Sequence, residues 1–235
     1  METLVSQTPK QAAGKALTQL LTQYSGQPTL LLLSGGSALA ILDYVDPVAL
    51  DSHLTLSTLD ERFSTDVRVN NFSQIQSTAF YAAAKERGAK EIKTTLTTTD
   101  TLAGATERFE NALRAWRQNH PNGIVLATVG IGNDGHTAGI FPGAPDTDFS
   151  GADWVTGYQV PETMSQHTKR ITVTHTFLRQ VLGGAVVFAA GENKWPIVAV
   201  AQQAHSATKD LPVGILQELP QVILVTDDPA ASLQR

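Results

Sequence analysis

The chain has 235 residues, a formal net charge of −5, 42% hydrophobic residues and no cysteine. This size suits one large α/β domain or two small ones, and the composition is that of an ordinary globular protein with a sizeable core. Without cysteine the chain has no disulfides, thiolate catalysis or thiolate zinc sites, and its acidic balance argues against nucleic acid as a partner. A small phosphorylated ligand stays open, because it needs only one or two local cations and some backbone N–H groups.

No segment of the sequence predicts a membrane span or an export signal. The longest apolar run, around Thr29–Leu33, is far shorter than the ~20 residues that cross a bilayer. The first residues, Met1–Leu4, lack the basic region and apolar core of a signal peptide. We therefore expect a cytoplasmic protein with no membrane partner.

Helical and strand patterns alternate along the chain. The first helix is expected over Pro9–Tyr24, with Thr8 as its cap and Gly26 ending it. Further helices are expected from residue 38, over 71–87 with breaks, over 102–118, over 194–203 and at the C-terminus. Strands are expected at 29–33, 54–59, 124–129, 185–190 and 222–226. Residues 142–168 are expected to be loop-like. The pattern of Ile171–Thr174 fits either a short strand or the approach to a helix.

This alternation predicts an α/β fold, a Rossmann-like parallel sheet flanked by helices. The sequence contains no linker and no internal repeat, so we expect a single domain over residues 1–235, with room for a small lobe near residues 142–170. Four polar or glycine-rich motifs directly follow predicted strands. Because ligands of open parallel sheets bind outside the carboxyl ends of the strands, these motifs predict one shared pocket. The motifs are Ser34–Ser37, Asp60–Arg62, Gly132–His136 and Gly191–Lys194.

The first motif, Ser34-Gly35-Gly36-Ser37, joins a predicted strand to a helix. Its glycines permit a tight turn, and its hydroxyls and N–H groups can hold a phosphate at the helix N-terminus. The alternative is a plain glycine turn in which Ser37 caps the helix. The motif is neither G-x-G-x-x-G nor a Walker loop, which argues against a dinucleotide or ATP.

The second motif, Asp60-Glu61-Arg62, places three charges after an apolar strand. One interpretation is a solvated loop with a local ion pair. The other is that Asp60 or Arg62 reaches into the pocket, where an arginine can hold a carboxylate or phosphate with two parallel hydrogen bonds.

The third motif brings Asp134 and His136 together in a glycine-rich loop. A metal needs about three protein ligands, and no ligand spacing such as H-E-x-x-H accompanies this pair. The G-x-S-x-G elbow of a serine hydrolase is absent as well. We therefore favour His136 as a general base or acid, with Asp134 orienting it or acting on a sugar hydroxyl. The alternative is a histidine that only caps the next helix.

The remaining cations are ambiguous by themselves. Lys194 opens a helix at a strand end, where it is either a point charge for phosphate or an ordinary exposed lysine. Arg170, ahead of Ile171–Thr174, is equally open. The other histidines have no distinguishing context and are expected to be structural or exposed; they are His53, His120, His167, His175 and His205.

Together these motifs resemble the superfamily of 6-phosphogluconolactonases and glucosamine-6-phosphate deaminases, in the same order and over nearly the whole chain. The most specific match is Gly130–Gly143, which resembles the long signature of the superfamily. Ser34–Ser37 resembles its sugar-phosphate loop. Weaker matches lie at Leu59–Arg62, Asn70–Phe72, Arg170–Thr174 and Gly191–Lys194.

The residues after His136 separate the two branches. Deaminases continue into Phe-Asn-Glu-Pro-Gly, whose Glu assists sugar ring opening. Here Gly139–Gly143 reads Gly-Ile-Phe-Pro-Gly, which is close to the lactonase Ser-Leu-Phe-Pro-Gly and contains no Glu. Gly130–Asn133 and Pro212–Gln217 are deaminase-like, and Phe63–Val69 lacks the Val-Pro and His often found in lactonases. The resemblance favours the lactonase branch. Because these segments differ from the lactonase pattern, the substrate need not be the standard one.

The resemblance implies hydrolysis of 6-phospho-D-glucono-1,5-lactone to 6-phospho-D-gluconate in the pentose phosphate pathway, by a carboxylic ester hydrolase without metal or organic cofactor. His136 is the implied base, and Arg62 or backbone N–H groups are candidate oxyanion donors. The implied catalytic set is His136, Asp134, Arg62 and Asp60, and the implied phosphate ligands are Ser34, Gly35, Gly36, Ser37, Arg170 and Lys194. Two alternatives stay open: a sugar-phosphate isomerase or deaminase with Asp60 as the base, and a non-catalytic sugar-phosphate-binding homologue.

Overall fold

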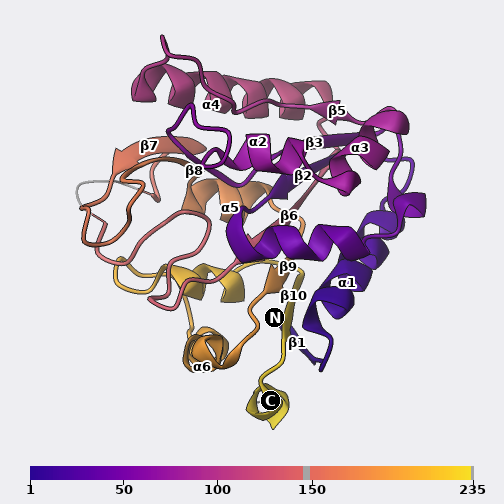
Figure 1. Cartoon of the computed structure of the whole chain (residues 1–235), viewed down its shortest axis with the longest axis vertical. Helices are drawn as coiled ribbons and strands as arrows, with labels where there is room; N and C mark the ends of the chain where they lie inside the picture. Colours follow the sequence, from indigo (N-terminus) through magenta and orange to yellow (C-terminus); the bar gives the residue numbers. More distant parts are fainter. Residues whose placement is uncertain (145–148, 234–235) are drawn as a thin grey trace.

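The computed structural model describes residues 1–144 and 149–233, and its centre is a sheet of seven parallel strands (Figure 1). The strand order is β1-β10-β9-β6-β2-β3-β5. The strands are β1 (Glu2–Val5), β2 (Thr29–Leu33), β3 (Leu54–Thr58), β5 (Lys90–Glu91), β6 (Ile124–Gly130), β9 (Gly184–Phe188) and β10 (Val222–Thr226). The predicted α/β fold with a parallel sheet flanked by helices is confirmed, and the edge strands β1 and β5 are additions to the predicted set.

Helices lie between the strands much as the hydrophobic periodicity predicts. The α-helices are α1 (Pro9–Gln23), α2 (Asn71–Gln76), α3 (Ala79–Glu86), α4 (Leu102–Asn119), α5 (His175–Val181) and α6 (Trp195–Gln203). The 3-10 helices are η1 (Gly36–Tyr44), η2 (Pro47–Ala49), η3 (Glu192–Lys194), η4 (Pro212–Gln217) and η5 (Pro229–Leu233). Thr8 occupies the N-cap position of α1 as predicted, although its side chain makes no capping hydrogen bond. Among the described helices none combines the length and the apolar character that crossing a bilayer requires.

The core consists of two apolar layers, one on each face of the sheet. Side chains alternate between the faces of a strand, so Leu30 and Leu32 of β2 belong to the layer that contains residues of α4, α5 and α6. Leu31 and Leu33 belong to the layer that contains residues of α1 and α3. Figure 1 shows α1 and α3 on the opposite side of the strands from α5 and α6. Because β2 is buried on both faces, its sequence is a continuous apolar run rather than an alternating one.

A second, antiparallel sheet corrects the sequence prediction. It pairs β4 (Asp60–Arg62) with β8 (Lys169–Val173), and β8 with β7 (Val155–Gln159), seen at the left of Figure 1. The predicted loop over residues 142–168 is therefore wrong at β7, and residues 145–148 of it lie outside the described part. Of the segment Ile171–Thr174, residues 171–173 belong to strand β8, and Thr174 is the N-cap of α5. The polar three-residue β4 has no strand pattern of its own, and its pairing with a distant segment makes it a strand.

The two sheets are joined through one residue. β3 ends at Thr58 and β4 begins at Asp60, so only Leu59 lies between them. Leu59 is fully buried, its N–H donates to the carbonyl of Leu33 at 3.0 Å, and its own carbonyl accepts from the N–H of Val173 at 3.3 Å. This junction fixes the antiparallel sheet against the carboxyl ends of the parallel strands.

Candidate active site

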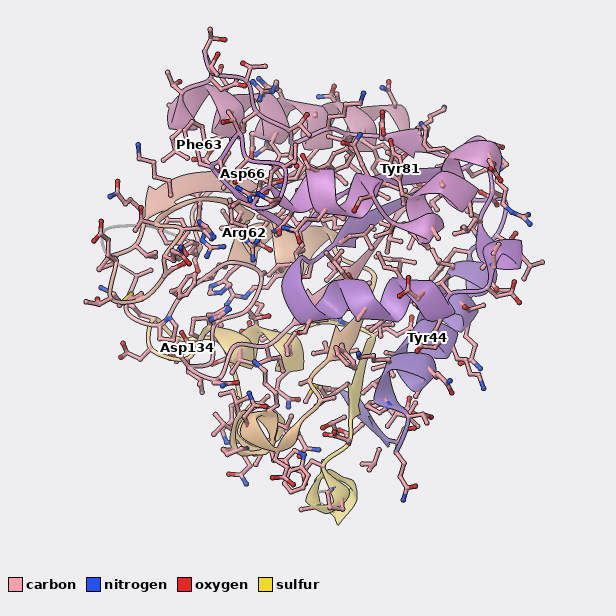
Figure 2. The ribbon with its side chains drawn as sticks, viewed as in Figure 1. Tyr44, Arg62, Phe63, Asp66, Tyr81 and Asp134 are labelled. Atoms are coloured by element: carbon pink, nitrogen blue, oxygen red, sulfur yellow. The ribbon has the colours of Figure 1, made fainter. Side chains whose placement is uncertain are left out.

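The four predicted motifs meet at one cavity of about 300 Å³, at the carboxyl ends of the parallel strands and beside the antiparallel sheet. Figure 2 marks two residues of this region, Arg62 on β4 and Asp134 in the loop after β6. The predicted residues that line the cavity are Ser34, Gly35, Gly36, Ser37, Asp60, Arg62, His136, Arg170 and Lys194. Asp134 does not line the cavity itself but contacts His136.

His136 and Asp134 form a hydrogen-bonded pair. Nδ1 of His136 lies 2.6 Å from Oδ1 of Asp134, which also accepts the backbone N–H of His136 at 3.1 Å. A carboxylate at Nδ1 favours the tautomer that leaves Nε2 free to accept a proton. Burial by itself raises the pKa of Asp134, but the hydrogen bond and charge of His136 outweigh it, so the pKa of this carboxyl is lowered. Residues 137–141 form a turn, so the alternative that His136 caps a following helix is wrong.

The loop is compact because Gly132 lies directly against the imidazole. The N–H of Gly132 donates to the carbonyl of His136 at 2.8 Å, and the N–H of Gly135 donates to the carbonyl of Gly132 at 3.0 Å. A Cβ at position 132 would overlap Nδ1 and Cε1 of His136 and crowd the carboxylate of Asp134. The glycine therefore permits the close approach that holds this pair.

Replacing Gly132 with alanine should displace the His136 ring. It should lower kcat for the lactone hydrolysis that the family resemblance implies by about 10²-fold, as expected when a catalytic group moves by an ångström. The backbone of Gly132 does not have a positive φ, so the fold itself should persist. The exposed Gly104 of α4 provides the matched control, since alanine is favourable inside a helix. Steady-state kinetics together with circular dichroism measure both effects, and an unchanged kcat for Gly132→Ala would contradict the proposed placement of the imidazole.

Phe141 stacks on the imidazole and also contacts Arg170. The ring centroids of His136 and Phe141 are 4.4 Å apart with an interplanar angle of 24°, and Cζ of Arg170 lies 5.2 Å from the Phe141 ring. The backbone of this turn is fixed by the antiparallel sheet, because the hydroxyl of Tyr158 donates to the carbonyl of Gly139 and accepts from the N–H of Phe141. The second sheet thus holds the loop that carries the candidate base.

Arg62 and Arg170 lie side by side, because they are paired in the register of β4 and β8. Nε of Arg170 donates to the carbonyl of His167 at 3.0 Å, Nη2 donates to Oγ of Ser165 at 2.8 Å, and Nη1 lies 3.7 Å from Oδ2 of Asp60. Burial lowers the pKa of Arg170, Asp60 opposes that shift and Arg62 adds to it. Two cations opposite each other repel, so an anion bound in the cavity would relieve this repulsion.

Lys194 adds a third cation at the cavity wall. Its Nζ donates to the carbonyl of Ile131 at 2.6 Å, which holds the side chain across the end of β6. Burial lowers the pKa of Lys194, and the charge of Asp134 partly offsets this. The alternative of an ordinary exposed lysine is wrong, because the side chain is half-buried and lines the cavity.

The loop Ser34–Ser37 enters η1 through Gly35, which occupies the N-cap position. Ser37 lies inside this helix, so the alternative that its side chain caps the helix is wrong. The N–H of Ser34 donates to Oγ1 of Thr128 at 3.1 Å, which ties the loop to β6. Gly36 has φ +65°, a backbone conformation that glycine adopts without strain.

Sequence reasoning missed several residues of the cavity wall. Asn71, Phe141, Met164 and Ser165 line it but were not selected as site residues. Met164 and Ser165 follow β7, a strand that the sequence did not reveal. Among the described residues, no group of three or more histidine, aspartate or glutamate side chains is arranged to hold a metal ion.

Comparison with known proteins identifies one family. The model of the family described as glucosamine-6-phosphate isomerases/6-phosphogluconolactonase matches residues 5–224. A curated relative, a probable 6-phosphogluconolactonase 2 of Arabidopsis thaliana, is 28% identical over 137 residues, which is 54% of this chain and 50% of that protein. The match thus spans about half the length of that relative.

Two solved structures share the fold over their whole length. The 6-phosphogluconolactonase of Trypanosoma brucei superposes with a TM-score of 0.74 at 21% identity, covering 100% of this chain and 98% of that one. A monomeric glucosamine-6-phosphate deaminase superposes with a TM-score of 0.75 at 18% identity, covering 99% and 100%. Because both activities occur on this fold, the overall likeness does not choose between them, and the choice depends on the residues of the cavity.

Proposed function

Because this chain belongs to the family of glucosamine-6-phosphate isomerases and 6-phosphogluconolactonases, we propose that it hydrolyses 6-phospho-D-glucono-1,5-lactone to 6-phospho-D-gluconate. The observation that carries the proposal is the contact between His136 and Phe141, whose ring centroids are 4.4 Å apart. Phe141 stands where the deaminase pattern has its ring-opening Glu, so an apolar ring covers the imidazole in place of a carboxylate. A base without that acid suits hydrolysis of an activated ester.

In this proposal His136 is the general base. Nε2 of His136 takes a proton from a water molecule while the water oxygen attacks the lactone carbonyl. The carbonyl oxygen gains a negative charge, which the Arg62 guanidinium stabilises. The tetrahedral intermediate then collapses, the bond from the carbonyl carbon to the ring oxygen breaks, and His136 returns its proton to that oxygen. The new carboxyl group releases a proton and leaves as 6-phosphogluconate.

The phosphate of the substrate is assigned to the cationic part of the cavity. Arg170 and Lys194 supply charge, and the N–H and hydroxyl groups of Ser34–Ser37 supply further donors. Asp60, paired with Arg170, keeps that guanidinium in place. The same proposal includes the pentose phosphate pathway as the setting and the cytoplasm as the compartment.

A lactonase assay tests the proposal. Lactone generated immediately before use from glucose 6-phosphate should be hydrolysed well above its spontaneous rate, and gluconolactone without the phosphate should react far more slowly. Release of ammonia from glucosamine 6-phosphate should not exceed that of a no-enzyme control. Ammonia release without lactone hydrolysis would replace the proposal by the deaminase reaction, and binding of 6-phosphogluconate without turnover of either substrate would indicate a non-catalytic homologue.

Replacing Lys194 with alanine should raise KM for the phosphorylated lactone by about 10- to 100-fold, the usual loss for a hydrogen bond to a charged group. Because the phosphate does not react, kcat should stay close to that of the wild type, as for uniform binding. Lys93, which is exposed and paired with Glu91 outside the cavity, provides a matched Lys93→Ala control. Initial-rate kinetics measure both variants, and an unchanged KM for Lys194→Ala would remove Lys194 from the phosphate site.

A further inference from the structure

Glu61 is a completely buried acidic residue to which the proposed reaction assigns no role. It lies in β4 between Asp60 and Arg62, both of which line the cavity. Because side chains alternate along a strand, the Glu61 carboxylate points to the other side of β4, away from the cavity. A buried charge is costly, so its surroundings must compensate it.

Four hydrogen-bond donors surround this carboxylate. Oε1 accepts the backbone N–H groups of Arg62 at 2.8 Å and of Asn71 at 2.6 Å. Oε2 accepts the backbone N–H of Phe72 at 3.0 Å and the hydroxyl of Thr94 at 2.9 Å. An ionised carboxylate has about four acceptor positions, and these donors occupy all of them. A protonated carboxyl group would place its own O–H against one of these donors.

These hydrogen bonds join β4 to the start of α2. Each of the two elements contributes a residue to the cavity wall, Arg62 from β4 and Asn71 from α2. Nδ2 of Asn71 donates to the carbonyl of Asp60 at 2.8 Å, so three hydrogen bonds hold the start of α2 to β4. Nη1 of Arg62 donates to the carbonyl of Val69 at 3.1 Å, just before α2. Glu61 therefore holds the backbone of Arg62 in place. Through α2 it also holds the preceding segment, whose Val69 carbonyl accepts the hydrogen bond from the Arg62 guanidinium.

We propose that Glu61 is a positioning residue that holds the Arg62 guanidinium in place for the oxyanion of the reaction. The inference rests on the proposed function, since it gives Arg62 its task. Glu61 does not touch the cavity and acts only through Arg62 and α2. It is distinguished from a purely structural group by its bonds, two of which end on residues that line the cavity.

The charge state of Glu61 decides whether the four bonds coexist. The charged neighbours of Glu61 in the antiparallel sheet are Asp60 and Arg62 on β4 and Arg170 on β8, and all three line the cavity on the side of β4 opposite to the Glu61 carboxylate. On its own side, α2 and the segment with Thr94 present uncharged donors. Burial raises the pKa of Glu61 to about 7, and the hydrogen bonds from Phe72, Asn71, Thr94 and Arg62 oppose the rise. Above that pH the carboxylate is ionised and accepts all four donors. Below it, protonation removes one acceptor position.

Glu61→Gln tests the inference, because it keeps the shape of the side chain and removes the charge. The amide cannot accept all four donors, so the start of α2 should shift against β4. We expect kcat to fall by about 10- to 100-fold at pH 8, with an unchanged inhibition constant for inorganic phosphate, which probes the cation site alone. Between pH 8 and pH 6 the wild type becomes protonated at Glu61, so the ratio of wild-type to variant kcat should decline toward one.

Two further variants make the result decisive. Thr94→Val removes one donor from the same carboxylate and leaves the donors on Arg62 and α2 in place, so it should lower kcat much less than Glu61→Gln does. Glu61→Gln should have no further effect on kcat in an Arg62→Gln background, because the residue it positions is then gone. If Glu61→Gln does not fold, as judged by circular dichroism, Glu61→Asp replaces it and should show the same loss of kcat and the same dependence on Arg62.

An unchanged kcat for Glu61→Gln at pH 8, an equal loss for Thr94→Val, or additive effects of Glu61→Gln and Arg62→Gln would each overturn the positioning role. Wild-type turnover of the lactone is measured first in the same assay. Its absence would contradict the proposed function itself, whereas turnover combined with any of these three results would contradict only the role of Glu61.

Discussion

Replacing His136 with alanine should lower kcat/KM for 6-phospho-D-glucono-1,5-lactone by about 10²- to 10⁴-fold, the range that a general base contributes. The imidazole is the one histidine side chain at the cavity among the described residues. Its Nδ1 is bound by Asp134 at 2.6 Å, which leaves Nε2 for the proton of the attacking water. The effect should lie in kcat, because the phosphate ligands are other residues and substrate binding is kept.

The loss should be specific to this histidine. His53 is exposed and lies outside the cavity, so His53→Ala is the matched control and should keep wild-type kinetics. Thermal unfolding of both variants distinguishes loss of chemistry from loss of fold. Near-normal hydrolysis by a folded His136→Ala protein would remove His136 as the base and, with it, the proposed mechanism.

Replacing Arg62 with glutamine should lower kcat by about 10²- to 10³-fold, the usual cost of losing a donor to a developing oxyanion. Arg62 borders the cavity, and its Nη1 is held by the carbonyl of Val69 at 3.1 Å. Within the described residues its Nε is buried without a hydrogen-bond partner, so the donor to the oxyanion has to be one of the Nη groups. Glutamine keeps polarity but loses the charge and the fork of N–H groups.

Arg68 offers the control for this substitution. Its side chain is 86% exposed and paired with Asp66, so Arg68→Gln should leave kcat and KM unchanged. Single-turnover measurements with saturating enzyme separate the chemical step from binding. If Arg62→Gln instead raises KM at constant kcat, Arg62 binds the ground state, and the oxyanion must be stabilised by backbone N–H groups.

The parallel sheet could be predicted because its signals are local. The four leucines of β2, Leu30–Leu33, form an apolar run buried on both faces, and the periodic residues of α4 cover one of those faces. The convergence of the four motifs followed from topology alone, since the carboxyl ends of parallel strands lie along one edge. Nine of the ten predicted site residues therefore line the same cavity, and the tenth, Asp134, contacts His136.

The antiparallel sheet could not be predicted because its cause is not local. The charged Asp60–Arg62 has no strand pattern and becomes a strand by pairing with Arg170–Thr172, far along the chain. The strand β7 contains a central glycine, Gly157, and its alternation is too short to identify. Contacts that depend on this sheet could not be predicted either. They include the stacking of Phe141 on His136 and the hydrogen bond from Arg170 to Ser165 in the loop after β7.

The single-residue junction at Leu59 has a consequence for how ligands enter and leave. The cavity lies between the parallel and the antiparallel sheet, and a hinge between the two sheets would open it. However, Leu59 is hydrogen-bonded to Leu33 on the side of the parallel sheet and to Val173 on the side of the antiparallel sheet. Swinging the layers apart would break both bonds and expose a buried leucine. The cavity is thus preformed, as small-molecule sites commonly are. Under the proposed function we therefore expect a ligand affinity without a penalty for a rarely populated closed state. We also expect diffusion or chemistry, rather than domain closure, to limit turnover.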